Sequence, residues 1–221
     1  MKRKSAILRI IEDLKTLYPD AVCSLNYTKD YELLFATRLS AQCTDARVNM
    51  VTPELFETFP TLEAFAAATP AQVGSIIRSC GLYQTKARDL VACAKVLVEQ
   101  FDSTVPSTME ELTSLPGIGR KTANLVLGDI FHQPAIVADT HCIRITGRLG
   151  LTDGTKDPVS VEKQLRACIP PEEGNDFCHR MVLHGRAVCM ARNPDCENCL
   201  LCKDCTFGKA ALKKKEKAQK K

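Results

Sequence analysis

The segment Leu115-Pro116-Gly117-Ile118-Gly119-Arg120-Lys121-Thr122-Ala123 decides the fold, because it connects two helices by a tight turn. Pro116 ends the first helix, and the two glycines allow the backbone to turn sharply and stay exposed. The amides that begin the second helix then point outward, at the positive end of its dipole. Such a turn can hold an anion such as a phosphate, although an ordinary connection between helices explains the glycines equally well.

On both sides of this segment, the sequence predicts helices almost everywhere. Apolar residues recur at the helical period from the start of the chain, at Ile7, Ile10, Ile11, Leu14 and Leu17. Signals for helix starts occur at Thr69-Pro70, Thr85, the capping box Ser107-x-x-Glu110, Asp139-Thr140 and Asp157-Pro158. Few stretches alternate as strands do. We therefore predict an all-α protein with a helix-hairpin-helix over about residues 108–131.

The net charge of +4 is concentrated at the C-terminal end of the chain. Six lysines and one glutamate give residues 213–221 a charge of +5, which leaves about −1 for the remainder. A DNA-binding protein of this composition has to gather its cations on one face, and the tail adds attraction to phosphates of any sequence. We expect the tail itself to be a disordered, solvated segment.

The sequence shows no segment for membrane insertion or secretion. No run approaches the roughly 20 apolar residues of a membrane helix, and the basic start of the chain leads only into a short apolar stretch. No apolar segment is left over that calls for a partner helix. We therefore expect a cytoplasmic monomer.

Cysteines are frequent and unevenly distributed. Five of the twelve lie in residues 189–205, at Cys189, Cys196, Cys199, Cys202 and Cys205. Without a secretory segment, such a group indicates a metal site rather than disulfides. Thiolates at this spacing suit an iron-sulfur cubane or a tetrahedral zinc ion. The spacing leaves two sets of four ligands open, one with Cys189 and one in which Cys202 replaces it.

Lys121 and Asp139 are candidate catalytic residues. Lys121 lies in the first helical turn after the hairpin, where Arg120, the helix dipole and partial burial favour the neutral amine that a Schiff-base nucleophile needs. A lysine that only contacts a phosphate explains this placement as well. Asp139 can assist nucleophilic attack or stabilise a cationic sugar, or it can serve only as a helix N-cap. A cap also fixes the carboxylate in place, so the two roles are compatible.

Together, these features resemble the endonuclease III branch of the helix-hairpin-helix DNA glycosylases. The resemblance covers nearly the whole chain up to about Leu212, with five motifs in the family's order and the family's cysteine spacing. These motifs are Leu39-Ser40-Ala41-Gln42-Cys43-Thr44-Asp45, Gly81-Leu82-Tyr83-Gln84-Thr85-Lys86-Ala87, Leu115 to Asn124, Val137 to Arg144, and Leu183-His184-Gly185-Arg186.

The resemblance implies a base-excision repair enzyme that acts on double-stranded DNA. The family's catalytic lysine falls on Lys121 and its aspartate on Asp139. Lys121 would attack C1′ of a flipped nucleotide, expel an oxidised or ring-saturated pyrimidine and form a Schiff base, and β-elimination would then cleave the strand 3′ to the abasic site. If the source is prokaryotic, we expect the protein to associate with the nucleoid.

Six further residues match the family's DNA contacts. They are Gln42, Leu82, Gly117, Gly119, Arg120 and His141. Gln42, Leu82 and His141 would fill or wedge the gap that the flipped nucleotide leaves, because an apolar wedge and hydrogen-bonding side chains can replace a lost base. Gln42 and Leu82 can also be ordinary core and turn residues. The glycines and Arg120 belong to the phosphate-binding turn.

The family's cluster ligands fall on Cys189, Cys196, Cys199 and Cys205, which implies a 4Fe-4S cluster with Cys202 as an additional thiol. The implied fold has two helical lobes with a DNA-binding cleft between them. A six-helix barrel occupies residues 23–132, and residues 1–22 and 133–212 form an iron-sulfur lobe. We expect the cluster loop, residues 189–205, to present basic residues such as Arg186, Arg192 and Lys203 to DNA.

Two other functions are compatible with parts of the sequence. An adenine-mismatch glycosylase of the same fold has no lysine nucleophile and has a catalytic glutamate where this chain has Arg38. A non-enzymatic DNA-binding or redox-sensing iron-sulfur protein would use the hairpin only for phosphates. The presence of Lys121 together with Asp139 and the wedge positions favours the glycosylase and lyase.

Overall fold

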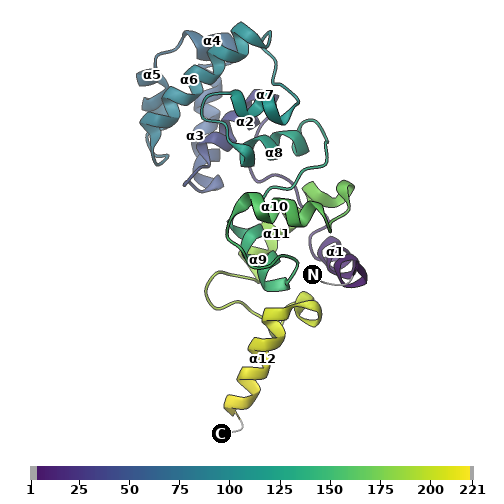
Figure 1. Ribbon diagram of the computed structural model, residues 1–221. Coiled ribbons are helices and arrows are strands. Elements are labelled where there is room, and N and C mark those ends of the chain that lie inside the picture. The colour runs from purple at the N-terminus through teal and green to yellow at the C-terminus, as the bar shows by residue number, and fades with distance from the viewer. Residues whose placement is uncertain (1–3, 220–221) are drawn as a thin grey trace. The chain divides into compact units, whose positions relative to one another are not determined.

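The computed structural model describes residues 4–219, which contain helices and no strand, so the predicted all-α class is confirmed. The chain forms two compact units, Cys23–Gln133 and Met1–Val22 with Pro134–Lys221 (Figure 1). We call them the barrel lobe and the cluster lobe. Within residues 4–219, every helix is too short or too polar to cross a bilayer.

The barrel lobe consists of seven helices. They are α2 (Asp30–Leu39), α3 (Asp45–Thr58), α4 (Leu62–Ala67), α5 (Pro70–Ile76), α6 (Tyr83–Gln100), α7 (Met109–Ser114) and α8 (Arg120–Asp129). Helix α2 packs against α3, α6 and α8, and all but two of its residues are buried. Phe35 and Phe65 pack edge to face with ring centroids 4.9 Å apart. The long α6 and the buried α2 thus support the short helices, including the hairpin.

A side-chain N-cap explains the starts of six α-helices, namely α3, α4, α5, α7, α9 (Thr140–Leu149) and α10 (Pro158–Arg166). Thr69 and Asp157 are N-caps as predicted, and Thr69 forms a capping box with Gln72. The expected box at Ser107 is displaced by one residue, because Thr108 caps α7 through the backbone amide of Glu111. The predicted start at Thr85 is wrong. Helix α6 begins at Tyr83, three residues earlier than an N-cap at Thr85 would give, after a left-handed Leu82.

The cluster lobe combines both ends of the chain. It contains α1 (Lys4–Leu17), α9 (Thr140–Leu149), α10 (Pro158–Arg166), the 3-10 turn η1 (Pro171–Glu173), α11 (Gly174–Ala187), the 3-10 turn η2 (Leu200–Asp204) and α12 (Thr206–Gln219). Helix α1 packs against α11 and η2, while α9 packs against α11 and α12. Helix α9 therefore lies beside the elements that flank the cysteine-rich segment.

The C-terminal tail differs from the expectation. We expected disorder from residue 213, yet α12 continues to Gln219, and residues 220 and 221 lie outside the described part. Alanine and lysine favour helices, and the Lys215 Nζ lies 2.6 Å from Glu197 Oε1 in the cysteine-rich segment. Helix propensity and this ion pair support the ordered conformation.

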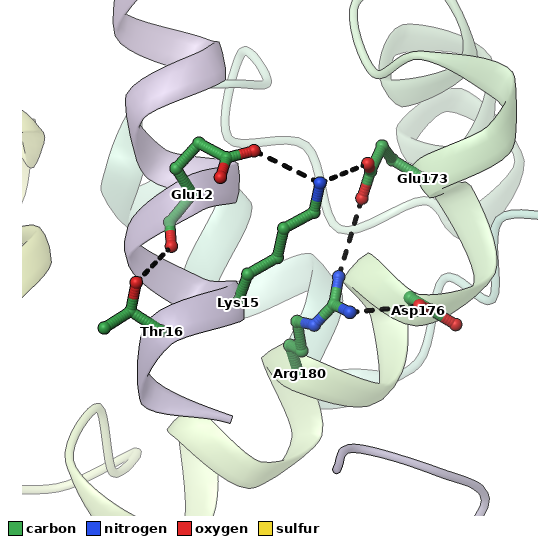
Figure 2. A network of polar contacts seen from close by, with 6 residues as sticks. All are labelled: Glu12, Lys15, Thr16, Glu173, Asp176 and Arg180. Carbon is green, nitrogen blue, oxygen red and sulfur yellow. Dashed lines mark hydrogen bonds and ion pairs between the residues drawn. The ribbon is translucent and has the colours of Figure 1, made fainter. Parts of the chain in front are cut away.

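Ion pairs hold α1 to the rest of the cluster lobe. Figure 2 shows Lys15 reaching Glu12 and Glu173, and Arg180 reaching Glu173 and Asp176. Arg180 is buried, with its Nη2 donating to Asp176 Oδ2 at 3.0 Å. Because Lys15 belongs to α1 and the other partners belong to η1 and α11, the network joins segments more than 150 residues apart.

Arg180→Met is expected to destabilise the cluster lobe by about 1.5–3 kcal/mol, the usual contribution of hydrogen bonds to charged groups. The change leaves Glu173 with Lys15 as its remaining partner in this network. Circular dichroism during urea denaturation measures the effect. Lys15→Met, at the more exposed end, is the matched control and should cost less. Equal effects would contradict the expectation that the buried Arg180 contributes more to stability than the more exposed Lys15.

Candidate functional site

The hairpin turn between α7 and α8 has the predicted geometry. Gly117 adopts φ +75°, which side-chain-bearing residues rarely adopt, and Gly119 is the N-cap of α8. The turn lies against an ion pair of the barrel lobe. In this pair, Arg38 Nη2 is 2.5 Å from Asp89 Oδ2. A Cβ on Gly117 would lie 2.7 Å from Asp89 Cβ. Position 117 therefore requires glycine for two reasons, the left-handed backbone and the lack of space for a Cβ.

Gly117→Ala should destabilise the barrel lobe by about 1–3 kcal/mol or more, because strain from the left-handed backbone adds to the clash with Asp89. Gly119→Ala is the matched control. Its φ is −105° and a Cβ there meets no atom within 4 Å, so the cost should not exceed about 1 kcal/mol, the usual effect of placing alanine at an N-cap. Urea denaturation followed by circular dichroism compares the two. Similar losses would show that the turn does not require glycine at 117 specifically.

Lys121 lies in the first turn of α8, one residue after the N-terminal Arg120. Both side chains are exposed, so the partial burial that we expected for Lys121 is wrong. The following residues Ala123 and Asn124 are buried against the lobe and fix the helix orientation. Helix α8 thus holds a primary amine at the surface, next to the outward-pointing amides of the turn.

Asp139 caps α9 in the cluster lobe. Its Oδ1 accepts a hydrogen bond of 2.6 Å from the backbone amide of Cys142. The preceding residues 135–138 are buried, and Asp139 itself is half-buried. The N-cap that the sequence indicated is present, and it holds the carboxylate in one orientation.

His141 is positioned by two neighbours that sequence reasoning did not identify. Arg144 Nη2 lies 3.1 Å from His141 Nδ1. Because a guanidinium only donates, Nδ1 accepts, and a neutral ring then carries its proton on Nε2. The ring also packs against α11, where a Cβ on Gly185 would be only 2.3 Å from Nδ1. The motifs Val137 to Arg144 and Leu183-His184-Gly185-Arg186 contain these neighbours, but they gave no indication of the contacts.

Gln42 and Leu82 lie on neighbouring turns of the barrel lobe. A Cβ on Gly81 would be 3.5 Å from the carbonyl oxygen of Gln42. Both residues have positive φ, 55° for Gln42 and 60° for Leu82, and the Leu82 side chain is 60% exposed. Non-glycine residues adopt this conformation at an energetic cost. The fold therefore brings together two predicted wedge residues and presents an apolar side chain to solvent.

The five clustered cysteines surround one pocket of the cluster lobe. Cys189, Cys196, Cys199, Cys202 and Cys205 all line this pocket. Burial raises the pKa of the Cys199 thiol to about 11 and also raises the pKa values of Cys196 and Cys205. A metal group would have to supply the attraction that deprotonates these thiols. In residues 4–219, no three His, Cys, Asp or Glu side chains are placed to hold a single metal ion.

Several groups direct hydrogen bonds toward the sulfur atoms of this pocket. Arg148 Nη1 donates to Cys189 Sγ at 3.3 Å, and the Gly208 amide donates to Cys205 Sγ at 3.2 Å. His184 Nε2 is 3.6 Å from Cys199 Sγ. Donors of this kind suit thiolates that bind a metal group. The chemistry of the pocket therefore fits a thiolate-ligated cluster, and sequence analysis missed these supporting residues.

Two side chains connect the cysteine-rich pocket to the N-terminal segment of the lobe, namely Tyr18, which follows α1, and Lys203. The hydroxyl of Tyr18 lies 3.1 Å from His184 Nδ1. Lys203, which we expected to face DNA, lies 3.0 Å from Asp13 Oδ2 of α1, and its side chain is 53% exposed. Its contact with DNA stays a prediction. Arg186 and Arg192 are exposed, as expected.

Comparison with known proteins gives consistent matches. The family described as HhH-GPD superfamily base excision DNA repair protein matches residues 35–171. Endonuclease III of Synechocystis sp. is 44% identical over 210 residues, 95% of this chain and 95% of that protein. Endonuclease III of Bacillus subtilis is 38% identical over 204 residues, 92% and 93% of the two chains. A solved structure of a trapped endonuclease III-DNA covalent intermediate is 40% identical, with a TM-score of 0.91 over 96% of this chain and all of that one.

Proposed function

Because this chain belongs to the HhH-GPD superfamily of base excision DNA repair proteins and, within it, to the endonuclease III family, we propose that Lys121 is its catalytic nucleophile. The chain is a DNA glycosylase and AP lyase. The Lys121 amine attacks C1′ of a flipped nucleotide, the C1′–N bond to the base breaks, and the base leaves with the bonding electrons. The C1′–O4′ bond then breaks, O4′ takes up a proton, and the nitrogen forms a Schiff base with C1′. The Schiff base acidifies the C2′ proton, and β-elimination then breaks the C3′–O bond. The exposed amine at the N-terminal turn of α8 supports this role.

We propose that Asp139 assists this attack. Its Oδ1 is engaged by the α9 amide, so the carboxylate is already oriented before DNA binds. A fixed negative charge stabilises the positive charge that develops on the sugar as the base departs. Orientation by the helix cap reduces the entropy that the reaction would otherwise lose in ordering this group.

DNA binding is proposed to use the hairpin and the wedge residues. Gly117 and Gly119 allow a phosphate to approach the amides at the start of α8, where Arg120 adds positive charge. Leu82 is suited to insert into the base stack, since it is apolar and exposed. Gln42 and His141 supply hydrogen-bonding groups for the gap. Basic α12 adds attraction to phosphates that does not depend on sequence.

The proposed cofactor is a 4Fe-4S cluster held by Cys189, Cys196, Cys199 and Cys205. When bound, such a cluster supplies a covalent junction that holds the 189–205 segment in one conformation. Three groups contact the sulfur atoms and would orient them as ligands. Arg148 and the Gly208 amide donate hydrogen bonds to sulfurs, and His184 lies close to a third. The bidentate ion pair of Arg9 with Asp204 holds η2 against α1. We propose a structural function for this site.

The proposed substrate is double-stranded DNA that contains an oxidised or ring-saturated pyrimidine or an abasic site. We further propose that the protein acts as a monomer in the cytoplasm. The observation that carries the function is the exposed Lys121 amine beside the phosphate-binding turn, in a chain that aligns with endonuclease III over 95% of its length. A mismatch glycosylase is disfavoured because Arg38 is paired with Asp89 under the hairpin and is not a carboxylic acid.

The test measures base release and strand cleavage on three duplexes that differ at one base pair. One contains thymine glycol, one an abasic site, and one adenine opposite 8-oxoguanine. Release from a thymine glycol duplex and strand cleavage at an abasic site, with no release of adenine opposite 8-oxoguanine, is the expected result. Adenine release without strand cleavage would indicate the mismatch glycosylase. Binding of all three duplexes without any release would indicate the non-enzymatic class.

A further inference from the structure

Two cysteines of the barrel lobe have no part in the proposed chemistry, yet each lies beside a proposed wedge residue. Cys43 follows Gln42 in the turn between α2 and α3, and Cys80 precedes Gly81 and Leu82 in the turn before α6. The Cys43 amide donates to the Ser40 carbonyl, so this thiol belongs to a closed turn. Neither cysteine belongs to the metal pocket.

The two thiols interact with each other across these turns. A Cβ on Gly81, the residue after Cys80, would lie 3.5 Å from the carbonyl oxygen of Gln42, the residue before Cys43, so the two turns are in contact. After burial, interaction with the Cys43 thiol is the next cause that raises the pKa of the Cys80 thiol. Cys80 is completely buried, whereas Cys43 is partly exposed, so a small oxidant can reach the pair through Cys43. Burial raises the pKa of the Cys80 thiol to about 11, so Cys80 is protonated near neutral pH. The pair thus combines an accessible sulfur with a protected one.

A buried lysine interacts with both thiols. Lys86 is completely buried, and its Nζ donates to the carbonyl oxygen of Leu39 at 2.7 Å. Its charge interacts electrostatically with Cys43 and Cys80. A neighbouring cation stabilises a thiolate and promotes attack on an oxidant. Lys86 therefore provides the electropositive surroundings that reactive cysteines require.

We propose that Cys43 and Cys80 form a reversible disulfide on exposure to a peroxide, and that this modification weakens binding to damaged DNA. The second part rests on the proposed function of Gln42 and Leu82. A disulfide holds its sulfurs at about 2.05 Å, closer than two unbonded thiols, so it draws the two turns together. Gln42 and Leu82 already have left-handed backbones, and a displacement of either turn changes the direction of the wedge.

The oxidation balances with hydrogen peroxide as the oxidant. The Cys43 thiolate attacks one peroxide oxygen, the O–O bond breaks, and the departing hydroxide combines with the former thiol proton to give water. Cys80 then attacks the sulfenic acid sulfur of Cys43, and the S–O bond breaks. The hydroxide that leaves takes the Cys80 proton as a second water. Two thiols lose two electrons in total, and a dithiol reductant restores them by exchange while it forms its own disulfide.

The cluster lobe contains a matched comparison pair. Cys142 and Cys178 also interact with each other, but both are buried, at 0% and 3% exposure. Cys178 Sγ accepts a hydrogen bond from the Val137 amide at 3.2 Å. If contact between thiols were sufficient, both pairs would oxidise. Because access also matters, we expect only Cys43 and Cys80 to respond to mild peroxide.

The experiment treats the full-length, cluster-containing protein with limited hydrogen peroxide and follows two readouts. Non-reducing tryptic mass spectrometry should detect peptide 39–47 linked to peptide 79–86, each of which contains one cysteine. Affinity for a duplex with an abasic-site analogue, measured by fluorescence anisotropy, should fall by about tenfold or more and recover with dithiothreitol. Visible absorbance must stay constant, so that cluster loss does not cause the change.

Cys80→Ala should abolish both the linked peptide and the loss of affinity, and Cys43→Ser at the more exposed position is the second variant. An absent linked peptide would overturn the proposal, as would the same loss of affinity in both variants. A linked peptide with unchanged affinity would overturn its regulatory part. Gln42→Ala and Leu82→Ala in the reduced protein test the wedge function separately, because unchanged DNA binding there contradicts the proposed function and not the disulfide.

Discussion

The Lys121→Gln protein is expected to form no covalent adduct with damaged DNA in the presence of borohydride. Borohydride reduces a Schiff base to a stable amine, so the wild type should be trapped on a thymine glycol or abasic duplex. Removal of the only attacking amine should lower base release and strand cleavage by roughly 10³-fold or more. Denaturing gel electrophoresis of the trapped complex, with single-turnover kinetics, measures both quantities.

Two control variants distinguish whether Lys121 acts as the nucleophile or only contacts a phosphate. Lys121→Arg keeps the positive charge for a phosphate but has no primary amine, so it should bind DNA and still form no adduct. Lys95→Gln removes the charge of another exposed lysine in the same lobe and should be trapped as the wild type is. An adduct of normal yield in Lys121→Gln would show that a different amine attacks. Normal turnover in Lys121→Arg would reduce Lys121 to a phosphate contact.

Replacement of Cys196 with serine is expected to remove the iron and to destabilise the cluster lobe by at least about 3 kcal/mol. The pocket is lined by five sulfur atoms. Burial raises the pKa values of Cys196, Cys199 and Cys205, so without a metal these three thiols stay protonated at neutral pH. The expected signs are loss of visible absorbance, loss of bound iron and a lower thermal unfolding temperature.

Cys202→Ser is the matched control, since Cys202 lines the same pocket but is not in the proposed ligand set. Iron content should remain at the wild-type value. A Cβ on Gly208 would lie 2.8 Å from Cys202 Sγ, which shows that this sulfur packs against α12. Iron loss in Cys202→Ser together with iron retention in Cys189→Ser would instead establish the evenly spaced set from Cys196 to Cys205.

Short-range patterns predicted much of the local structure. Thr69, Asp139 and Asp157 were recognised as N-caps because a cap depends on one side chain and an amide three residues later. The start of α6 was misplaced because Leu82 adopts a left-handed conformation that no local rule assigns to leucine. The order of the 213–219 segment was missed because its ion pair partner, Glu197, lies outside the local window.

The sequence by itself determined the all-helical class, the hairpin turn, the candidate lysine and aspartate, and the cysteine-rich segment. These features depend on residues that are close along the chain, where periodicity, glycine placement and spacing carry the physical constraints. Only the tertiary structure decided which distant groups meet. It places Arg38 and Asp89 under the hairpin, and His141 against Gly185. Such contacts depend on packing between helices far apart in sequence, and no local pattern encodes that packing.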